Sequence, residues 1–323
     1  MTLHFNRRHI VGSLGAAVAA TVIPAFAQAA PVKILVGFPP GGSADTTARL
    51  IAEKMSAIMG NPVIVENRPG AGGRIAAQAV KDAAPDGNML MIAPLAVMVV
   101  QPVVFKSVKY DTTKDFTPIG NAALFPLAVA VGPATPAKTF AELIAWLKAN
   151  PMQANFGSPA TGSLPHFLGE MIGQALNVKI QHVPYQGGAP LMTALLGSQL
   201  PVGIDTPAEF AENHRAGKLK ILAVSGGQRA AQFPDVPTLR EQGVNLEASA
   251  WFGIFGPAGM PAARTESLST ALSAALRQPD VISKLAALGL QAAPESSAEM
   301  ARRMAADKAR WEPVIKSTGF QAD

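Results

Sequence analysis

Short apolar runs rich in strand-forming residues alternate along the chain with segments whose apolar residues have helical spacing. The runs that predict strands cover residues 32–36, 62–66, 89–93, 127–131, 154–157, 178–183, 202–205 and 219–224. Strands that alternate with helices in this way are typical of mostly parallel sheets with helices on their faces. The sequence therefore predicts the α/β fold class.

Two helices are especially clear. The segment after Ser163 places its apolar residues on one helix face, at Leu164, Phe167, Leu168, Met171 and Ile172. Thr139 and Glu142 have the spacing of a capping box, which predicts that a helix begins after Thr139. A helix-rich tail follows Pro261.

Chain length indicates two lobes. The 323 residues exceed the size, about 250 residues, above which single cores tend to divide. Two segments are typical of crossings between lobes, the proline-containing segment 131–136 and the apolar segment 247–256. We therefore expect lobe 1 to comprise residues 28–130 and 250–323, lobe 2 to comprise residues 131–249, and the two crossing strands to act as a hinge.

The N-terminus predicts export. Arg7 and Arg8 precede an apolar run at 10–23, and Ala25-Phe26-Ala27 matches the A-x-A pattern of a cleavage site. We expect residues 1–27 to be a signal peptide that sends the protein to the periplasm by the Sec or the twin-arginine route. Removal of the two arginines lowers the formal charge from +5 to +3.

Composition excludes several functions. The small positive charge has no block of Lys and Arg that resembles a nucleic-acid footprint, so we expect no nucleic-acid partner. Cysteine is absent, and His166, His182 and His214 lack metal-ligand spacing, so we expect no metal site. The segment 70–75 begins like a dinucleotide-binding loop but ends in Ile75, so we expect no cofactor.

Three loops rich in small residues join predicted strands to predicted helices, at 37–45, 156–163 and 183–190. Glycine lets a backbone approach a ligand closely, and the first N–H groups of a helix have no partner within the helix. In a parallel sheet such loops share the carboxyl edge, where ligands bind. They predict a cleft of amide and hydroxyl donors that suits a small carboxylate.

Several side chains near these loops have two interpretations. Ser43 either caps the helix that follows it or faces a ligand, and Asp45 complements the helix dipole in either case. Tyr185 either closes over a ligand or packs at the sheet edge. Asp205 either accepts a hydrogen bond from a ligand or holds an Asx turn before Pro207.

At these loops the sequence resembles the Bug family, the periplasmic solute receptors of tripartite tricarboxylate transporters. Nine motifs carry the resemblance, in order: FPPGGSAD at 38–45, VENRPGAGG at 65–73, AAPDG at 83–87, GSPATGSLPH at 157–166, HVPYQGGAP at 182–190, LLGSQ at 195–199, AGKLKILAV at 216–224, FPDVPTL at 233–239 and WFGIFGPAG at 251–259. The resemblance covers nearly the whole chain after the signal peptide.

The resemblance implies a two-lobed periplasmic-binding-protein fold of the Venus flytrap kind, type II-like, that closes on a carboxylate and presents it to a membrane permease. With the loop analysis, it gives these candidate ligand-binding residues: Phe38, Pro40, Gly41, Gly42, Ser43, Asp45, Ser158, Ala160, Thr161, Gly162, Ser163, Tyr185, Gly187, Gly188 and Asp205. The family commonly has a Ser/Thr-containing loop after the third strand, whereas this chain reads APLAVM at 93–98. That departure favours a less polar acid, aromatic or aliphatic.

We hypothesise binding without turnover by a monomer. A rival hypothesis is an exported hydrolase with Ser43 or Ser158 as nucleophile and His166 as base, which requires a serine–histidine hydrogen bond of about 3 Å. A receptor that feeds a membrane sensor rather than a permease is a third, because either partner could read the closed form.

Overall fold

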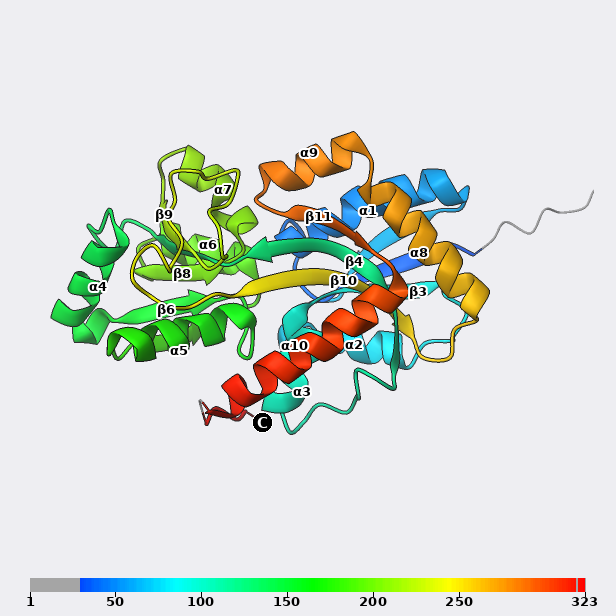
Figure 1. Cartoon of the computed structure of the whole chain (residues 1–323), viewed down its shortest axis with the longest axis horizontal. Helices are drawn as coiled ribbons and strands as arrows, with labels where there is room; N and C mark the ends of the chain where they lie inside the picture. The colour runs from blue at the N-terminus through cyan, green and yellow to red at the C-terminus, as the bar shows by residue number, and fades with distance from the viewer. Residues whose placement is uncertain (1–29, 318, 323) are drawn as a thin grey trace, which may run out of the picture.

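The computed structural model describes residues 30–317 and 319–322, and the predicted signal peptide lies outside these residues. Two sheets with helices packed on their faces form two lobes, which Figure 1 shows side by side along the long axis of the molecule. No helix among the described residues is both long enough and apolar enough to span a bilayer.

The first sheet has six strands in the order β11-β4-β10-β3-β1-β2. Their bounds are β1 Val32–Val36, β2 Val63–Asn67, β3 Met89–Pro94, β4 Phe116–Pro126, β10 Ser249–Pro257 and β11 Gln291–Glu295. The helices of this first lobe are α1 Ser43–Met59, α2 Arg74–Lys81, α3 Gln101–Val104, α8 Ala262–Leu276, α9 Pro279–Ala287 and α10 Ser297–Ser317, with the short turns η1 Ala71–Gly73 and η2 Ala96–Val100. The lobe thus combines an early and a late part of the chain.

The second sheet has five strands in the order β7-β6-β8-β5-β9. Their bounds are β5 Ala128–Val131, β6 Asn155–Ser158, β7 Gln181–Pro184, β8 Val202–Asp205 and β9 Lys220–Val224. The helices of this second lobe are α4 Phe140–Ala149, α5 Leu164–Leu176, α6 Gly188–Leu196 and α7 Pro207–Arg215, with the turn η3 Pro151–Gln153. The lobe is the green part of Figure 1.

Both sheets are mixed. The strand–helix–strand units pair in parallel, as β1 does with β2 and β3, and as β6 does with β7 and β8. Strand β10 is antiparallel to β3 and β4, and β5 is antiparallel to β8 and β9. The two-lobed α/β fold is confirmed. In each sheet the antiparallel pairs involve a strand that adjoins a crossing, as β10 does in the first sheet and β5 in the second.

Local sequence explains the predicted helices. Ser163 is the N-cap of α5, and its Oγ accepts a hydrogen bond from the backbone N–H of His166 at 3.3 Å. Thr139 caps α4 by accepting from the N–H of Glu142 at 3.2 Å. Each bond satisfies an N–H group that has no partner within its helix.

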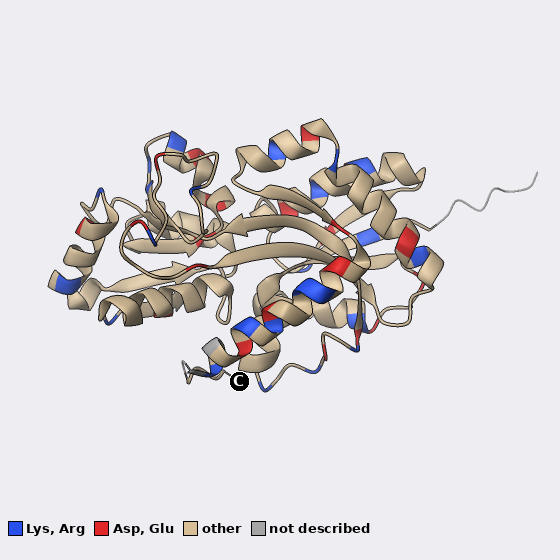
Figure 2. Ribbon diagram, viewed as in Figure 1, with Lys and Arg blue, Asp and Glu red and all other residues tan. Residues whose placement is uncertain are grey.

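Apolar sequence also explains where the cores lie. The strand β1 is covered on both faces, and Val32, Ile34, Leu35 and Val36 are completely buried. A strand buried on both faces reads as a nearly continuous apolar run, and this one is interrupted only by Lys33. The long central strands β4 and β10 contain no charged residue, whereas Figure 2 shows acidic and basic residues interleaved along α10.

Two strands connect the lobes side by side. Strand β4 ends at Pro126 in the first sheet and β5 begins at Ala128 in the second, while β10 pairs Ser249 with Pro126 as it enters the first sheet (Figure 1). The first crossing therefore lies at Leu127, before the segment 131–136 chosen from the sequence. The apolar run 127–131 has no internal break, and the prolines that follow it mark the loop before α4 instead.

Ser225 joins the two crossings. Its Oγ accepts a hydrogen bond from the N–H of Leu127 at 2.8 Å and donates to the carbonyl oxygen of Ala248 at 2.5 Å. Its own N–H donates to the carbonyl oxygen of Leu127 at 2.8 Å. Because Ser225 is fully buried, these bonds have no competing water.

Replacing this serine tests the link. The Ser225→Ala variant leaves one N–H and one carbonyl group buried without their side-chain partner, which should lower the free energy of unfolding by about 1–3 kcal/mol. Urea unfolding measures it, with Ser267→Ala, on an exposed face of α8, as the control. Equal stability of the two variants would contradict the role given to Ser225.

Candidate functional site

The first turns of four helices converge on one pocket between the lobes. The first lobe contributes α1, and the second lobe contributes α5, α6 and α7, each following a strand of its sheet. The space open to water-sized molecules is about 70 Å³. One water requires about 10–15 Å³ by this measure, so the pocket in this closed form suits a small molecule.

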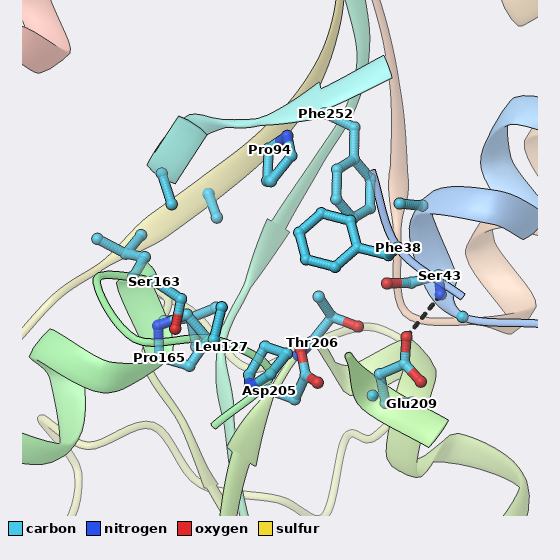
Figure 3. Close-up of a pocket in the computed structure, with 18 of the residues that line it drawn as sticks. Phe38, Ser43, Pro94, Leu127, Ser163, Pro165, Asp205, Thr206, Glu209 and Phe252 are labelled. Carbon is cyan, nitrogen blue, oxygen red and sulfur yellow. Dashed lines mark hydrogen bonds between the residues drawn. The ribbon is translucent and has the colours of Figure 1, made fainter. Parts of the chain in front are cut away.

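Asp205 and Thr206 lie at the pocket at the end of β8 (Figure 3). Asp205 is only 4% exposed; its Oδ1 accepts from the N–H of Thr206 at 2.7 Å, and its Oδ2 has no hydrogen-bond partner. The Thr206 Oγ1 is also buried without a partner. Buried polar atoms are nearly always hydrogen-bonded, so these two oxygens indicate a ligand position.

Glu209 extends from the first turn of α7 to the other lobe. Its Oε1 accepts a hydrogen bond from the backbone N–H of Ser43 at 2.5 Å, drawn as a dashed line in Figure 3. The bond satisfies the first amide of α1 with a carboxylate, which the positive end of the helix dipole also favours. The two lobes are therefore joined across the pocket by one direct polar contact.

The two acids influence each other. Burial, and then the neighbouring Glu209, raise the pKa of Asp205 well above its usual value. Burial also raises the pKa of Glu209, but the hydrogen bond from Ser43 opposes that effect. Since two adjacent carboxyl groups, one buried and one partly buried, do not both ionise readily, we assign the proton of the pair to Asp205 and the charge to Glu209.

The rest of the pocket wall is apolar. Phe38, Pro94 and Phe252 from the first lobe face the polar residues of the second lobe (Figure 3). The ring of Phe252 lies 4.6 Å from that of Phe125 on the neighbouring crossing strand. Residues 94–96 line the pocket with Pro, Leu and Ala, at the loop where the family resemblance led us to expect a less polar wall.

No Lys, Arg or His is among the described residues that line the pocket. A bound anion would be met by peptide N–H groups, hydroxyl groups and the protonated Asp205. Gln101 adds a polar group from the first lobe, because its Nε2 donates to the carbonyl oxygen of Gly72 at 2.9 Å while its Oε1 is buried without a partner.

The structure gathers about half of the candidate residues at the pocket. Those that line it are Phe38, Gly42, Ser43, Ala160, Ser163, Gly188 and Asp205. Those that do not line it are Pro40, Gly41, Asp45, Ser158, Thr161, Gly162, Tyr185 and Gly187. The second group lies in the same loops, one or a few residues from the lining residues.

Two of these residues support the loop at 38–45. Ser43 is not the N-cap of α1 as its position suggested, because Gly42 takes that place and Ser43 is the first helical residue. Asp45 accepts hydrogen bonds from Gly41, Arg49 and Asn67 at 2.8–2.9 Å. Burial acts to raise the pKa of Asp45, but these bonds outweigh it and hold that pKa below its usual value.

Tyr185 and Gly187 have packing roles. The ring of Tyr185 packs against the apolar core of the second lobe. Gly187 has φ 111°, a backbone conformation that favours glycine, and its N–H donates to the carbonyl oxygen of Pro159 at 2.9 Å. This bond connects the loops that lead into α5 and α6.

A histidine pair, with His166 buried and His182 partly buried, supports the loop before α5. The Ser158 Oγ lies 2.7 Å from the His182 Nε2, and the His182 ring stacks on that of His166 with centroids 3.8 Å apart. The His166 Nδ1 accepts from the N–H of Gly162 at 3.2 Å. Burial lowers the pKa of His166 to about 4, and burial followed by the charge of His166 lowers that of His182 to about 3.

This pair bears on the hydrolase hypothesis. Ser158 meets the distance requirement, but with His182 rather than with His166. Ser158 is completely buried, does not line the pocket, and also contacts the carbonyl oxygen of Ala160 at 3.0 Å. Among the residues that the structure describes, no group of three or more His, Asp or Glu side chains is placed to hold a metal ion.

Several pocket residues were not predicted from the sequence. They include Gln101, Phe125, Leu127, Thr206, Glu209, Ala250 and Phe252. Phe125, Leu127, Ala250 and Phe252 lie on or between the crossing strands, so their exposure to the pocket depends on how the lobes meet. The sequence did offer one indication for Glu209: it lies in the first turn of a helix that begins at Pro207, soon after the strand that ends in Asp205.

The fold and this pocket between two lobes define a periplasmic-type solute-binding protein. A model of the family described as "Tripartite tricarboxylate transporter family receptor" (TctC) matches residues 47–320. The chain therefore belongs to the TctC family, and it is a solute-binding receptor of the kind that serves tripartite transporters.

Individual relatives agree with this assignment. The chain is 33% identical over 311 residues to BugT of Bordetella pertussis, covering 94% of each protein. The structure is similar to that of MatC from Rhodopseudomonas palustris with bound malate, with 31% identity, a TM-score of 0.84, and coverage of 88% of this chain and 98% of that one. It is also similar to R. palustris Rpa4515 with adipate, with 32% identity, a TM-score of 0.87, and coverage of 90% and 98%.

The state of the histidine pair can be measured. Because the pKa values of His166 and His182 are depressed, both rings should remain neutral as the pH falls from 7 to about 5, and their NMR resonances should not shift over that range. The His166→Asn and His182→Asn variants assign the signals. A titration midpoint near 6.5, the value of a solvated histidine, would contradict the buried pair.

Proposed function

We propose that this receptor captures a small carboxylate between its lobes and delivers it to the membrane permease of a tripartite tricarboxylate-type transporter. The observation that carries the proposal is the buried Asp205 Oδ2, which lacks a partner and lines the pocket beside the unpartnered Thr206 Oγ1. Family members with malate and adipate support the ligand class.

The ligand carboxylate binds to the second lobe in this proposal. The helices α5, α6 and α7 begin at the pocket, so the N–H groups of their first turns present donors to an anion. The protonated Asp205 and the Thr206 hydroxyl add two more. Hydrogen bonds to charged groups contribute about 1.5–3 kcal/mol each, and a few of them stabilise a bound anion without a cation.

The first lobe covers the remainder of the ligand. Phe38, Pro94 and Phe252 provide an apolar surface opposite the donors, which suits an aliphatic or aromatic body. Contacts with both lobes exist only in the closed form, so the ligand favours closure by its differential affinity for that form. The crossing strands at Leu127 and Ser249 then absorb the hinge rotation.

The remaining parts of the proposal concern the whole chain. Residues 1–27 direct export to the periplasm as a signal peptide, by the Sec or the twin-arginine route, and the mature receptor acts as a monomer. The sequence divided the chain into lobe 1 at 28–130 and 250–323 and lobe 2 at 131–249; with β5 in the second sheet, we propose instead that lobe 2 begins after Leu127. The permease binds the closed form.

The carboxylate itself can be tested. Native mass spectrometry of freshly purified protein identifies the retained acid, and calorimetry then compares this acid with its primary amide. Loss of two charge-assisted hydrogen bonds should weaken binding at least about 100-fold. Equal affinities for the acid and the amide would contradict a carboxylate site.

The protonation of Asp205 predicts how affinity depends on pH. Because the raised pKa keeps this carboxyl group neutral, affinity for an anion should be constant below that pKa and fall up to about tenfold per pH unit above it. The Asp205→Asn variant, whose amide donates at every pH, should bind with little pH dependence, and Asp205→Ala should bind more weakly throughout. Calorimetry from about pH 5 to 9 measures this.

The outcome that contradicts this role is specific. If the affinity of the wild-type protein rises with pH, the ligand contacts an ionised Asp205 and carries a positive group there. If Asp205→Ala binds the acid as tightly as the wild-type protein does, Asp205 does not contact the ligand.

A further inference from the structure

Glu209 occupies a position at which a ligand carboxylate could bind. Its Oε1 accepts from the N–H of Ser43, the first amide of α1, at 2.5 Å. A Cβ atom on Gly188 would overlap the same carboxylate, and one on Gly42 would lie 3.3 Å from it. The glycines at the starts of α1 and α6 therefore leave just enough space for the side chain of α7.

Among the described residues, no cationic side chain lies beside Glu209 to hold a second anion. The described residues that line the pocket include two acids, Asp205 and Glu209, and no Lys, Arg or His. The wall opposite them is mostly apolar, with Phe38, Pro94 and Phe252, and the Nε2 of its polar residue Gln101 already donates to the carbonyl oxygen of Gly72. A second ligand carboxylate would have to displace Glu209 from Ser43 or be buried against apolar rings, and both are unfavourable.

Building on the proposed function, we propose that Glu209 determines specificity by acting as a built-in carboxylate at the N-terminus of α1, so that the receptor selects monocarboxylates with an apolar body over dicarboxylates. The ligand then supplies one carboxylate, to the second lobe, and the protein supplies the other. The apolar loop at 94–96 and the Phe252 ring complete a site for the uncharged end of such an acid.

The test uses pairs of acids that differ by one terminal carboxylate. Calorimetry measures the affinities for hexanoate and adipate and for benzoate and terephthalate. The wild-type protein should bind the monoacid of a pair at least about tenfold more tightly than the diacid. The Glu209→Ala variant, which frees the Ser43 N–H and removes the charge, should shift this ratio at least about tenfold toward the diacid.

Two further variants separate charge from space. Glu209→Gln keeps the size of the side chain and the acceptor for the Ser43 N–H. Its ratio of diacid to monoacid affinity should therefore shift less than that of Glu209→Ala. Gly188→Ala places a methyl group where the carboxylate lies and should shift the ratio in the same direction as Glu209→Ala. Glu212→Ala, at an exposed position of α7, is the matched control and should keep the wild-type ratio. Circular dichroism confirms that each variant is folded.

The outcomes distinguish this inference from the proposed function. If the wild-type protein prefers diacids, or if Glu209→Ala leaves the ratio unchanged, the specificity role is overturned while the receptor for carboxylates remains. If no acid of either class binds, both are overturned.

Discussion

The structure depends on two neighbouring carboxyl groups between its lobes, a buried one at Asp205 and a partly buried one at Glu209, with no cationic side chain among the described residues that line their pocket. Asp205 lies at the end of a strand and Glu209 on a helix of the same lobe; the N–H of Thr206 donates to Asp205, and Ser43 of the other lobe donates to Glu209. Burying charge is costly unless it is hydrogen-bonded. The Ser43 donor comes from the opposite lobe, so the contact between the lobes and the electrostatics of the pocket are linked.

This linkage gives the two lobes different tasks. The second lobe presents three helix starts and the unpartnered oxygens of Asp205 and Thr206, whereas the first lobe presents aromatic and aliphatic side chains. The crossings that position them are held together by Ser225, which bonds to Leu127 and Ala248. A ligand with one polar and one apolar end would therefore contact both lobes in a fixed orientation.

Sequence reasoning identified most strands, the fold class and the loops at the pocket, because parallel strands with capped helices follow local rules. It missed β4, in which Pro118, Gly120 and Asn121 interrupt the apolar pattern, since pairing with β10 supplies the stability that local propensity lacks. It also missed Glu209, whose contact with Ser43 joins positions 166 residues apart. Within the loops, the sequence could not separate residues that face the pocket from those, such as Asp45, that hold the loop in shape.

A crystal structure of the receptor with its retained acid tests the central claim most directly. The account predicts the ligand carboxylate within hydrogen-bonding distance of the Asp205 Oδ2 and the Thr206 Oγ1, the apolar end of the ligand against Phe38 and Phe252, and Glu209 still bonded to the Ser43 N–H. A ligand carboxylate bonded to the Ser43 N–H with Glu209 displaced, or a ligand bound outside the pocket between the lobes, would contradict it.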